Sequence, residues 1–166
     1  MIERGNPSGL LVCRRNGTQV WYFHLKIRNT RPRTTAVVKV CCTKIEREDE
    51  KGRWIPEVFP ERLLFCWAYS DVYGVQRTVG DEAGLDLAFV DEGADEVKLA
   101  LGIRPNNVRD GIKKGEKIKL YLGVEVNGHL QADRSIVELK WDGEWSNDAS
   151  KMFENVSVRL LDGVLT

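Results

Sequence analysis

The sequence predicts an all-β protein, an immunoglobulin-like antiparallel β-sandwich of about nine strands. Composition is the first observation: 18 Val and 8 Ile stand against only 8 Ala, which favours pleated strands over helices. The second is that apolar and polar residues alternate with period two in several segments. The third is that Gly, Asn and Asp clusters separate these segments at short spacing, with no alternating helices between them.

Length and charge exclude several other classes of protein. The chain has 166 residues, of which 42% are hydrophobic, and 25 basic residues balance 25 acidic ones. These values are typical of one folded domain, here residues 1–166 with 1–9 expected to fray, and not of a disordered chain. We see no apolar window long enough to cross a bilayer and no signal peptide, so a cytoplasmic location is favoured.

The amino-terminal half contains the first two predicted strands. Leu10–Arg15 and Gln19–Asn29 flank Asn16-Gly17, a dipeptide typical of a tight hairpin turn. Within Gln19–Asn29, the residues that alternate onto one apolar face are Trp21, Phe23, Leu25 and Ile27.

Four further strands are expected in the middle of the chain. Thr34–Ile45 is rich in β-branched residues and is interpreted as a strand with a bulge, because its apolar set shifts face. The other three have alternating apolar residues and are Arg62–Ser70, Leu85–Val90 (with Leu85, Leu87 and Phe89 inward) and Val97–Ile103.

The carboxy-terminal third gives the clearest hairpin. Lys117–Asn127 alternates over eleven residues, Asn127-Gly128 suits a type I′ turn, and the chain returns over Leu130–Trp141. Ser146–Phe153 is the one expected helical turn, capped by Ser146 or Asn147, and Asn155–Leu161 is the last strand.

Some of these segments resemble a known group of domains. They are the aromatic strand Trp21–Asn29, the Thr35-Ala36 step, the strand ending Ile45-Glu46-Arg47 and the segment Trp141–Trp145, whose sequence is WDGEW. The resemblance is to uncharacterised immunoglobulin-like sandwich domains of bacterial and archaeal proteins. It covers most of the chain and implies the sandwich fold. That group has no established activity, so the resemblance implies no catalytic residue.

Cysteines and histidines give no metal or cofactor signature. Cys13, Cys41, Cys42 and Cys66 form no CxxC pair, and His24 and His129 have no HxH or HExxH spacing. Reduced thiols in the core are favoured, and a bridge from Cys41 or Cys42 to Cys66 is the open alternative, since it would mimic the immunoglobulin disulfide. At most one of the adjacent Cys41 and Cys42 is expected in the core. Both histidines are expected at the surface.

No motif in the chain indicates a catalytic centre. There is no nucleophile elbow, phosphate loop or dinucleotide fingerprint. Trp141 and Trp145 beside Asp142 and Glu144 leave open a carbohydrate-binding or carbohydrate-active protein, although tryptophans at such a turn more often fill a core. Asn16-Gly17-Thr18 and Asn155-Val156-Ser157 match the glycosylation sequon but are explained as a turn and a strand start.

The zero net charge conceals two blocks of opposite sign. From Arg14 to Arg47, nine bases accompany a single acid, and from Asp81 to Glu96, seven acids occur without a base. The favoured interpretation is that these charges belong to solvated outer faces of the sandwich, where neighbouring sheets could also pair the two blocks; the alternative is a separate binding surface. In the second case Lys26, Arg28, Arg31 and Arg33 would form a patch for an anionic partner.

The favoured function is a non-enzymatic protein-interaction or ligand-binding module without metal or cofactor. The candidate contact residues are Arg28, Arg31 and Arg33 in one loop and the aromatic Trp54 and Trp145. Another protein, anionic if the arginines make contact, is the favoured partner. A small molecule or glycan is less favoured, and so is nucleic acid bound through the basic block.

Overall fold

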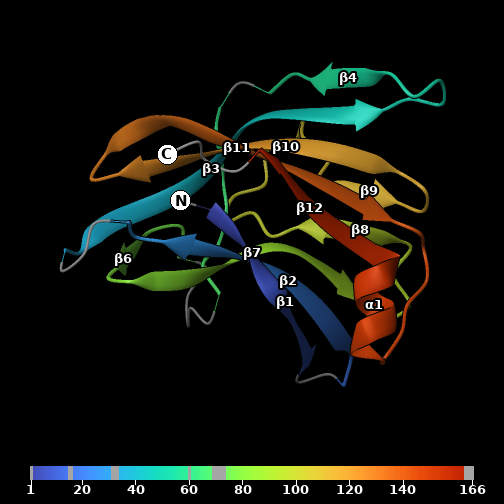
Figure 1. Ribbon diagram of the computed structural model, residues 1–166. Coiled ribbons are helices and arrows are strands. Elements are labelled where there is room, and N and C mark those ends of the chain that lie inside the picture. The colour runs from blue at the N-terminus through green and yellow to red at the C-terminus, as the bar shows by residue number, and fades with distance from the viewer. Residues whose placement is uncertain (1, 15–16, 31–33, 60, 69–73, 163–166) are drawn as a thin grey trace.

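The fold is an all-β sandwich of two antiparallel sheets (Figure 1). The computed structural model describes residues 2–14, 17–30, 34–59, 61–68 and 74–162. Within these ranges, no helix has the length and apolar character needed to span a membrane.

Each sheet has one long path of hydrogen-bonded strands. The five-stranded sheet, sheet A, has the order β1 (Ile2–Cys13), β2 (Gln19–Arg28), β7 (Glu82–Asp91), β8 (Glu96–Leu99) and β9 (Gly111–Lys113). The seven-stranded sheet, sheet B, has the order β12 (Val156–Asp162), β11 (His129–Trp141), β10 (Lys117–Val126), β3 (Ala36–Glu48) and β4 (Trp54–Glu57). Two short strands complete it, β5 (Leu63–Leu64) and β6 (Arg77–Val79).

Residues 2–9, which are expected from the sequence to fray, belong to strand β1 in the structure. β1 pairs with β2 from Ile2 opposite Ile27 to Cys13 opposite Gln19, with an irregularity between Arg4 and Gly9. Backbone hydrogen bonding to β2 therefore orders a segment that its Gly and Pro content alone would leave loose.

Strand β3 has three successive short partners along the edge away from β10. These are β4, then β5 opposite Cys41 and Cys42, then β6 opposite Ala36–Val38. After β5 the chain crosses to sheet A, where Trp67 bridges Leu85. The expected strand Arg62–Ser70 is thus divided between the two sheets, and its last two residues lie outside the described ranges.

Two bulges decide which side chains face the core. Tyr121 pairs with Lys44 but Leu122 pairs with Cys42, so Thr43 is the extra residue of the expected bulge in β3. The second bulge was not expected. Phe23 pairs with Ala88 while His24 pairs with Asp86, which makes Leu87 the extra residue in β7.

This second bulge corrects the expected orientation of Phe89. Beyond Leu87 the alternation shifts by one position, so Ala88 and Val90 are buried and Phe89 is only half-buried. Phe89 packs beside Tyr22 on the outer face of sheet A, with ring centroids 5.7 Å apart.

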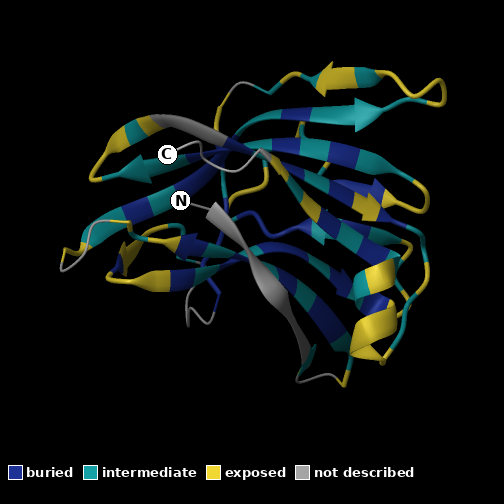
Figure 2. Ribbon diagram, in the orientation of Figure 1, coloured by how far each residue is buried: buried dark blue, intermediate teal, exposed yellow. Residues whose placement is uncertain are grey.

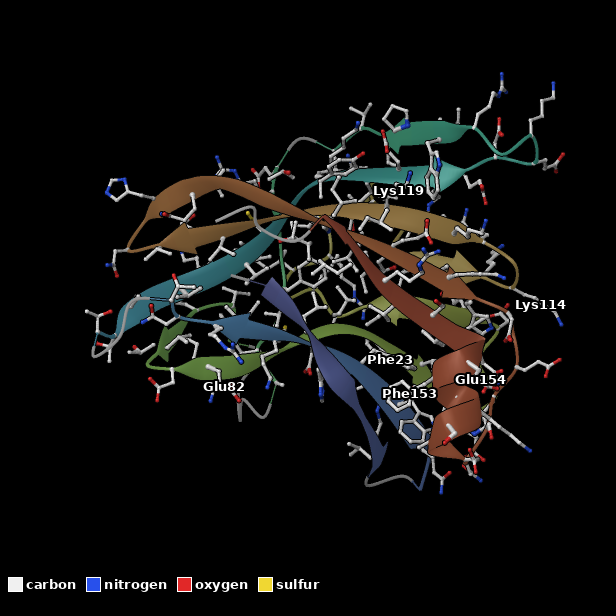
Figure 3. All side chains as sticks on the ribbon, in the orientation of Figure 1. Phe23, Glu82, Lys114, Lys119, Phe153 and Glu154 are labelled. Atoms are coloured by element: carbon white, nitrogen blue, oxygen red, sulfur yellow. The ribbon has the colours of Figure 1, made fainter. Side chains whose placement is uncertain are left out.

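The core lies between the sheets and is closed at one end by α1 (Ala149–Asn155) (Figures 1 and 2). Trp141 and Trp67 are the largest fully buried side chains. Phe153 of α1 meets Phe23 edge to face, with ring centroids 5.8 Å apart (Figure 3). The helix cap is Asp148, whose side chain accepts from the Lys151 N–H, and not the expected Ser146 or Asn147.

Candidate interaction surface

The basic and acidic blocks of the sequence meet inside one sheet, because β2 and β7 are antiparallel neighbours. Glu82 lies opposite Arg28 and forms an ion pair with Lys26, with the Lys26 Nζ and the Glu82 Oε2 3.4 Å apart. The His24 Nε2 lies 2.8 Å from an Asp86 carboxylate oxygen. Arg14 and Asp91 form a third pair across the same seam. Internal pairing of the two blocks, which the sequence left possible, is observed for these residues.

The arginine site expected from the sequence therefore has an acidic neighbour. Arg28 is exposed but its guanidinium lies 3.9 Å from Glu82, which offsets its charge. Arg31 and Arg33 lie outside the described residues. Arg28 on its own therefore gives little support to an anion-binding patch.

The outer face of sheet B is a ladder of alternating charges across four strands. Lys119 of β10 lies opposite Glu46 of β3 on one side and Glu138 of β11 on the other. Arg159 of β12 continues the series with an ion pair to Glu138 at 3.5 Å. Lys119 also covers Trp54 of β4, with Nζ 3.8 Å from the ring centroid (Figure 3). Trp54 is thus half-buried beneath a lysine and not an open aromatic platform.

Two neighbouring side chains on this face lower the pKa of Glu46. The Lys44 ammonium, 2.6 Å from its carboxylate, and the Tyr121 hydroxyl, which donates to it at 2.7 Å, lower the pKa of Glu46. The same hydrogen bond raises the pKa of Lys44. This face is consequently charge-paired and suited to contact with water.

A second network of ion pairs lies beside β4. The Arg47 guanidinium contacts Glu57 and Glu116 and donates to the Arg109 carbonyl. The Arg109 Nη2 in turn donates to both carboxylate oxygens of Glu116, at 2.6 and 2.5 Å. Burial raises the pKa of Glu116, but Arg109 and the Lys113 N–H outweigh this effect and the net pKa is lowered. The network ties β3 to the loop between β8 and β9.

Exposed apolar side chains occur on the segments that this network joins. Among the described residues, four large apolar side chains are exposed: Ile55 (48%), Val58 (89%), Ile103 (73%) and Leu161 (38%). Ile55 pairs with Arg47, which reaches Arg109, and Val58 follows on the connection from β4 to β5.

Ile103 lies on the β8–β9 loop, whose Arg109 carbonyl accepts from Arg47. It adjoins Gly102, whose N–H donates to the Leu64 carbonyl of β5 at 2.9 Å. We call Ile55, Val58 and Ile103 the apolar flank. Its residues stand on the edge strand β4 of sheet B, on the connection that follows β4 and on the β8–β9 loop. The expectation that Ile103 is an inward strand residue is wrong, because β8 ends at Leu99 and the last buried residue before the exposed Ile103 is Leu101, which bridges Phe65.

The two tryptophans of the carbohydrate hypothesis do not form a stacking site. Trp141 is fully buried in the core and offers no face to a sugar. Trp145 is half-buried against the core, and its indole N–H donates to the Asn147 side chain at 3.4 Å. Trp145 adjoins α1 whereas Trp54 lies on β4, so these two candidate residues do not form one surface (Figure 1).

Cys41, Cys42 and Cys66 are buried thiols, as expected for these three, and the Cys13 side chain lies outside the described part. Cys42 faces the core, and Cys41 lies on the opposite face, 3.6 Å from the Gly123 carbonyl. A Cβ on Gly123 would meet Leu130 at 2.9 Å, so the bare glycine leaves the space that Leu130 fills beside Cys41. Burial raises the pKa of Cys42 to about 12.

His129 is exposed as expected, but His24 is not, because only 9% of its side chain is accessible beside Asp86. Among the described residues, no group of His, Cys, Asp and Glu side chains is arranged to hold a metal ion. The Asn155 side-chain amide, part of one sequon, donates to the Glu144 carbonyl at 2.7 Å. Asn155 ends α1, and β12 begins at the next residue.

Sequence reasoning identified Trp54 but missed its lysine and the apolar flank. Period-two patterns cannot reveal Ile55 and Val58, because β4 is only four residues long. The available signal was the run Trp54–Phe59, which places four apolar side chains in a Pro-containing segment.

Comparisons with known proteins give no relative for this arrangement. The chain matches no protein-family model, no curated protein and no solved structure.

Proposed function

We propose that this chain is a protein-interaction module that binds its partner through the apolar flank. The observation that carries the proposal is the exposure of Ile55 and Val58, three positions apart on edge strand β4 and the connection after it, together with Ile103 on the β8–β9 loop. Grouped apolar side chains on a soluble domain are typical of contact surfaces, whereas single ones need no explanation.

The geometry of β4 favours side-chain contacts over addition of a partner strand. The Asp49 N–H donates to the Arg53 carbonyl at 2.8 Å, and alternation from this pair makes Glu46–Pro56 a non-hydrogen-bonded pair. The nitrogen of Pro56 therefore faces the free edge of β4, where it can donate no hydrogen bond. Proline at this position protects an edge strand from pairing with another chain.

The charges around the flank indicate a partner surface of low net charge. Arg109 is held by Glu116, and Arg104 pairs with Asp110 at 3.1 Å. Paired charges at the rim of an apolar patch contribute to specificity more than to affinity. We therefore favour an apolar protein surface over the anionic partner considered from the sequence.

Immunoglobulin-like connectivity remains part of this proposal. It is supported by the two antiparallel sheets and by buried Trp67 beside Cys66.

The test compares capture by three forms of the immobilised chain from a cell lysate. The proposal predicts proteins that the wild type retains, that the I55S/V58S/I103S variant loses, and that the matched surface variant Leu161→Ser still retains. Circular dichroism and thermal unfolding establish that both variants fold. If the triple variant retains the same proteins as the wild type, the apolar flank is not the contact surface.

A further inference from the structure

The turn between β10 and β11 holds an asparagine in an unusual position. Asn127 and Gly128 form the two-residue loop closed by Val126 opposite His129, and both have positive φ, 49° and 84°. Both residues are exposed, and nothing lies within 4 Å of the position that a Cβ on Gly128 would take.

Asn127 also fastens this turn to the start of β3. Its N–H donates to the Val37 carbonyl at 2.8 Å, and the Val37 N–H donates to the Asn127 Oδ1 at 3.1 Å. These two bonds extend the β3–β10 ladder beyond its last strand pair, Val126 opposite Val38. On its other side Val37 pairs with Thr78 of β6.

We propose that Asn127 is a site of spontaneous deamidation and that its isoaspartate product releases the β10–β11 turn from β3. The Gly128 amide nitrogen loses its proton to water and attacks the Asn127 Cγ. A bond from this nitrogen to Cγ forms, the bond from Cγ to Nδ2 breaks, and ammonia leaves with a proton. Water then opens the succinimide ring at either carbonyl, which gives aspartate or isoaspartate.

Three features of the turn favour this reaction at Asn127. Gly128 has no side chain to block the approach of its nitrogen, and the turn is open to water. The Val37 N–H binds Oδ1 and not Nδ2, so it polarises the carbonyl that is attacked. The exposed Asn106, Asn107 and Asn147 provide internal comparisons, since each is followed by a residue with a side chain.

The two products have different structural effects. Aspartate keeps the length of the main chain, and its carboxylate can still accept from the Val37 N–H. Isoaspartate adds one carbon to the main chain of a two-residue turn, whose register depends on loop length. Both bonds to Val37 are then lost, and Ala36 and Val37 keep only their pairing with β6.

The experiment follows the folded full chain during warm incubation at neutral pH, by peptide mapping that separates aspartate from isoaspartate. We expect isoaspartate at residue 127 before any change at Asn106, Asn107 or Asn147, together with faster amide hydrogen exchange at Val37. The matched variant Asn127→Asp should keep slow exchange there.

Two results would overturn the proposal. One is an unchanged Asn127 after a time in which a free peptide of residues 122–132 converts completely. The other is isoaspartate at residue 127 with exchange at Val37 as slow as in the fresh protein.

Discussion

Lys26 of β2 and Glu82 of β7 form an ion pair, with Nζ and Oε2 3.4 Å apart, across neighbouring strands of sheet A. This pair belongs to the basic and acidic blocks whose charges cancel in the sequence. Charges from the two blocks therefore pair locally between β2 and β7, and this seam offers no large field of a single sign.

Pairs along this seam should differ in their contribution to stability. Both partners are largely shielded in the His24–Asp86 pair, whereas half of the Glu82 side chain is exposed. We expect Asp86→Ala to lower the free energy of unfolding by roughly 1–3 kcal/mol, because a shielded imidazole loses a partner. Glu82→Ala should change it by less than about 1 kcal/mol. Chemical denaturation measures both, and equal losses would contradict the difference in shielding.

The two tryptophans of the WDGEW segment should also behave differently. Trp141→Ala removes a fully buried side chain and should destabilise the protein by about 3–5 kcal/mol, or prevent folding. Trp141→Phe, which leaves a smaller cavity, provides a milder variant, and Trp145→Ala at the half-buried neighbour should cost less than Trp141→Ala. Denaturation midpoints of the three variants provide the measurement. A larger loss from Trp145→Ala than from Trp141→Ala would refute the core assignment.

The thiol of Cys42 should be inert in the folded protein. Its pKa is raised to about 12 by burial, so almost none of it is thiolate at mildly alkaline pH, and the thiolate is the reactive form. Alkylation by iodoacetamide, located by mass spectrometry, should leave Cys42 unlabelled until denaturant is added. Labelling of the native protein at the rate of the denatured protein would show that this thiol is accessible.

Acid should weaken the network beside β4. Because the pKa of Glu116 is lowered on folding, its contribution to stability is complete above the unfolded value near 4.5. That contribution disappears as pH falls through the lower, folded value. The measurement is the free energy of unfolding against pH for the wild type and Glu116→Gln. We expect the wild type's advantage at neutral pH to shrink below pH 4.5. An advantage that grew in acid would contradict the direction of the shift.

The sequence predicted the strands that are long enough to show a period. Lys117–Asn127 and Leu130–Trp141 match β10 and β11 closely, because eleven alternating residues and an Asn-Gly turn leave few alternatives. The bulge in β3 was also visible, since Cys42 and Ile45 are three residues apart and both face the core.

The alternation of apolar and polar residues did not predict features that depend on tertiary contacts. Strands β4, β5, β6 and β9 have two to four residues each and form only because a longer strand lies beside them. The bulge at Leu87 moves Phe89 outward, and the continuous apolar run from Leu87 to Val90 does not mark which of its residues face the core. Exposure of Ile103 follows from the end of β8, which no local signal marks.

The candidate site was predicted only in part, because it too depends on tertiary contacts. Trp54 was identified by residue type, but its contact with Lys119 joins segments 65 positions apart and requires the pairing of β3 with both neighbours. The arginine patch was weakened by Glu82, which the sequence places 54 positions after Arg28.

The most direct test of the apolar flank is photo-cross-linking with a photo-reactive phenylalanine analogue at position 58 or, as the matched control, at position 161. Both positions carry exposed apolar side chains in the wild type, but only Val58 belongs to the flank. We predict one discrete protein adduct from position 58 that is absent from position 161 and is suppressed by Ile55→Ser with Ile103→Ser. Adducts that are the same from both positions, or that survive those two substitutions unchanged, would contradict the proposed interaction surface.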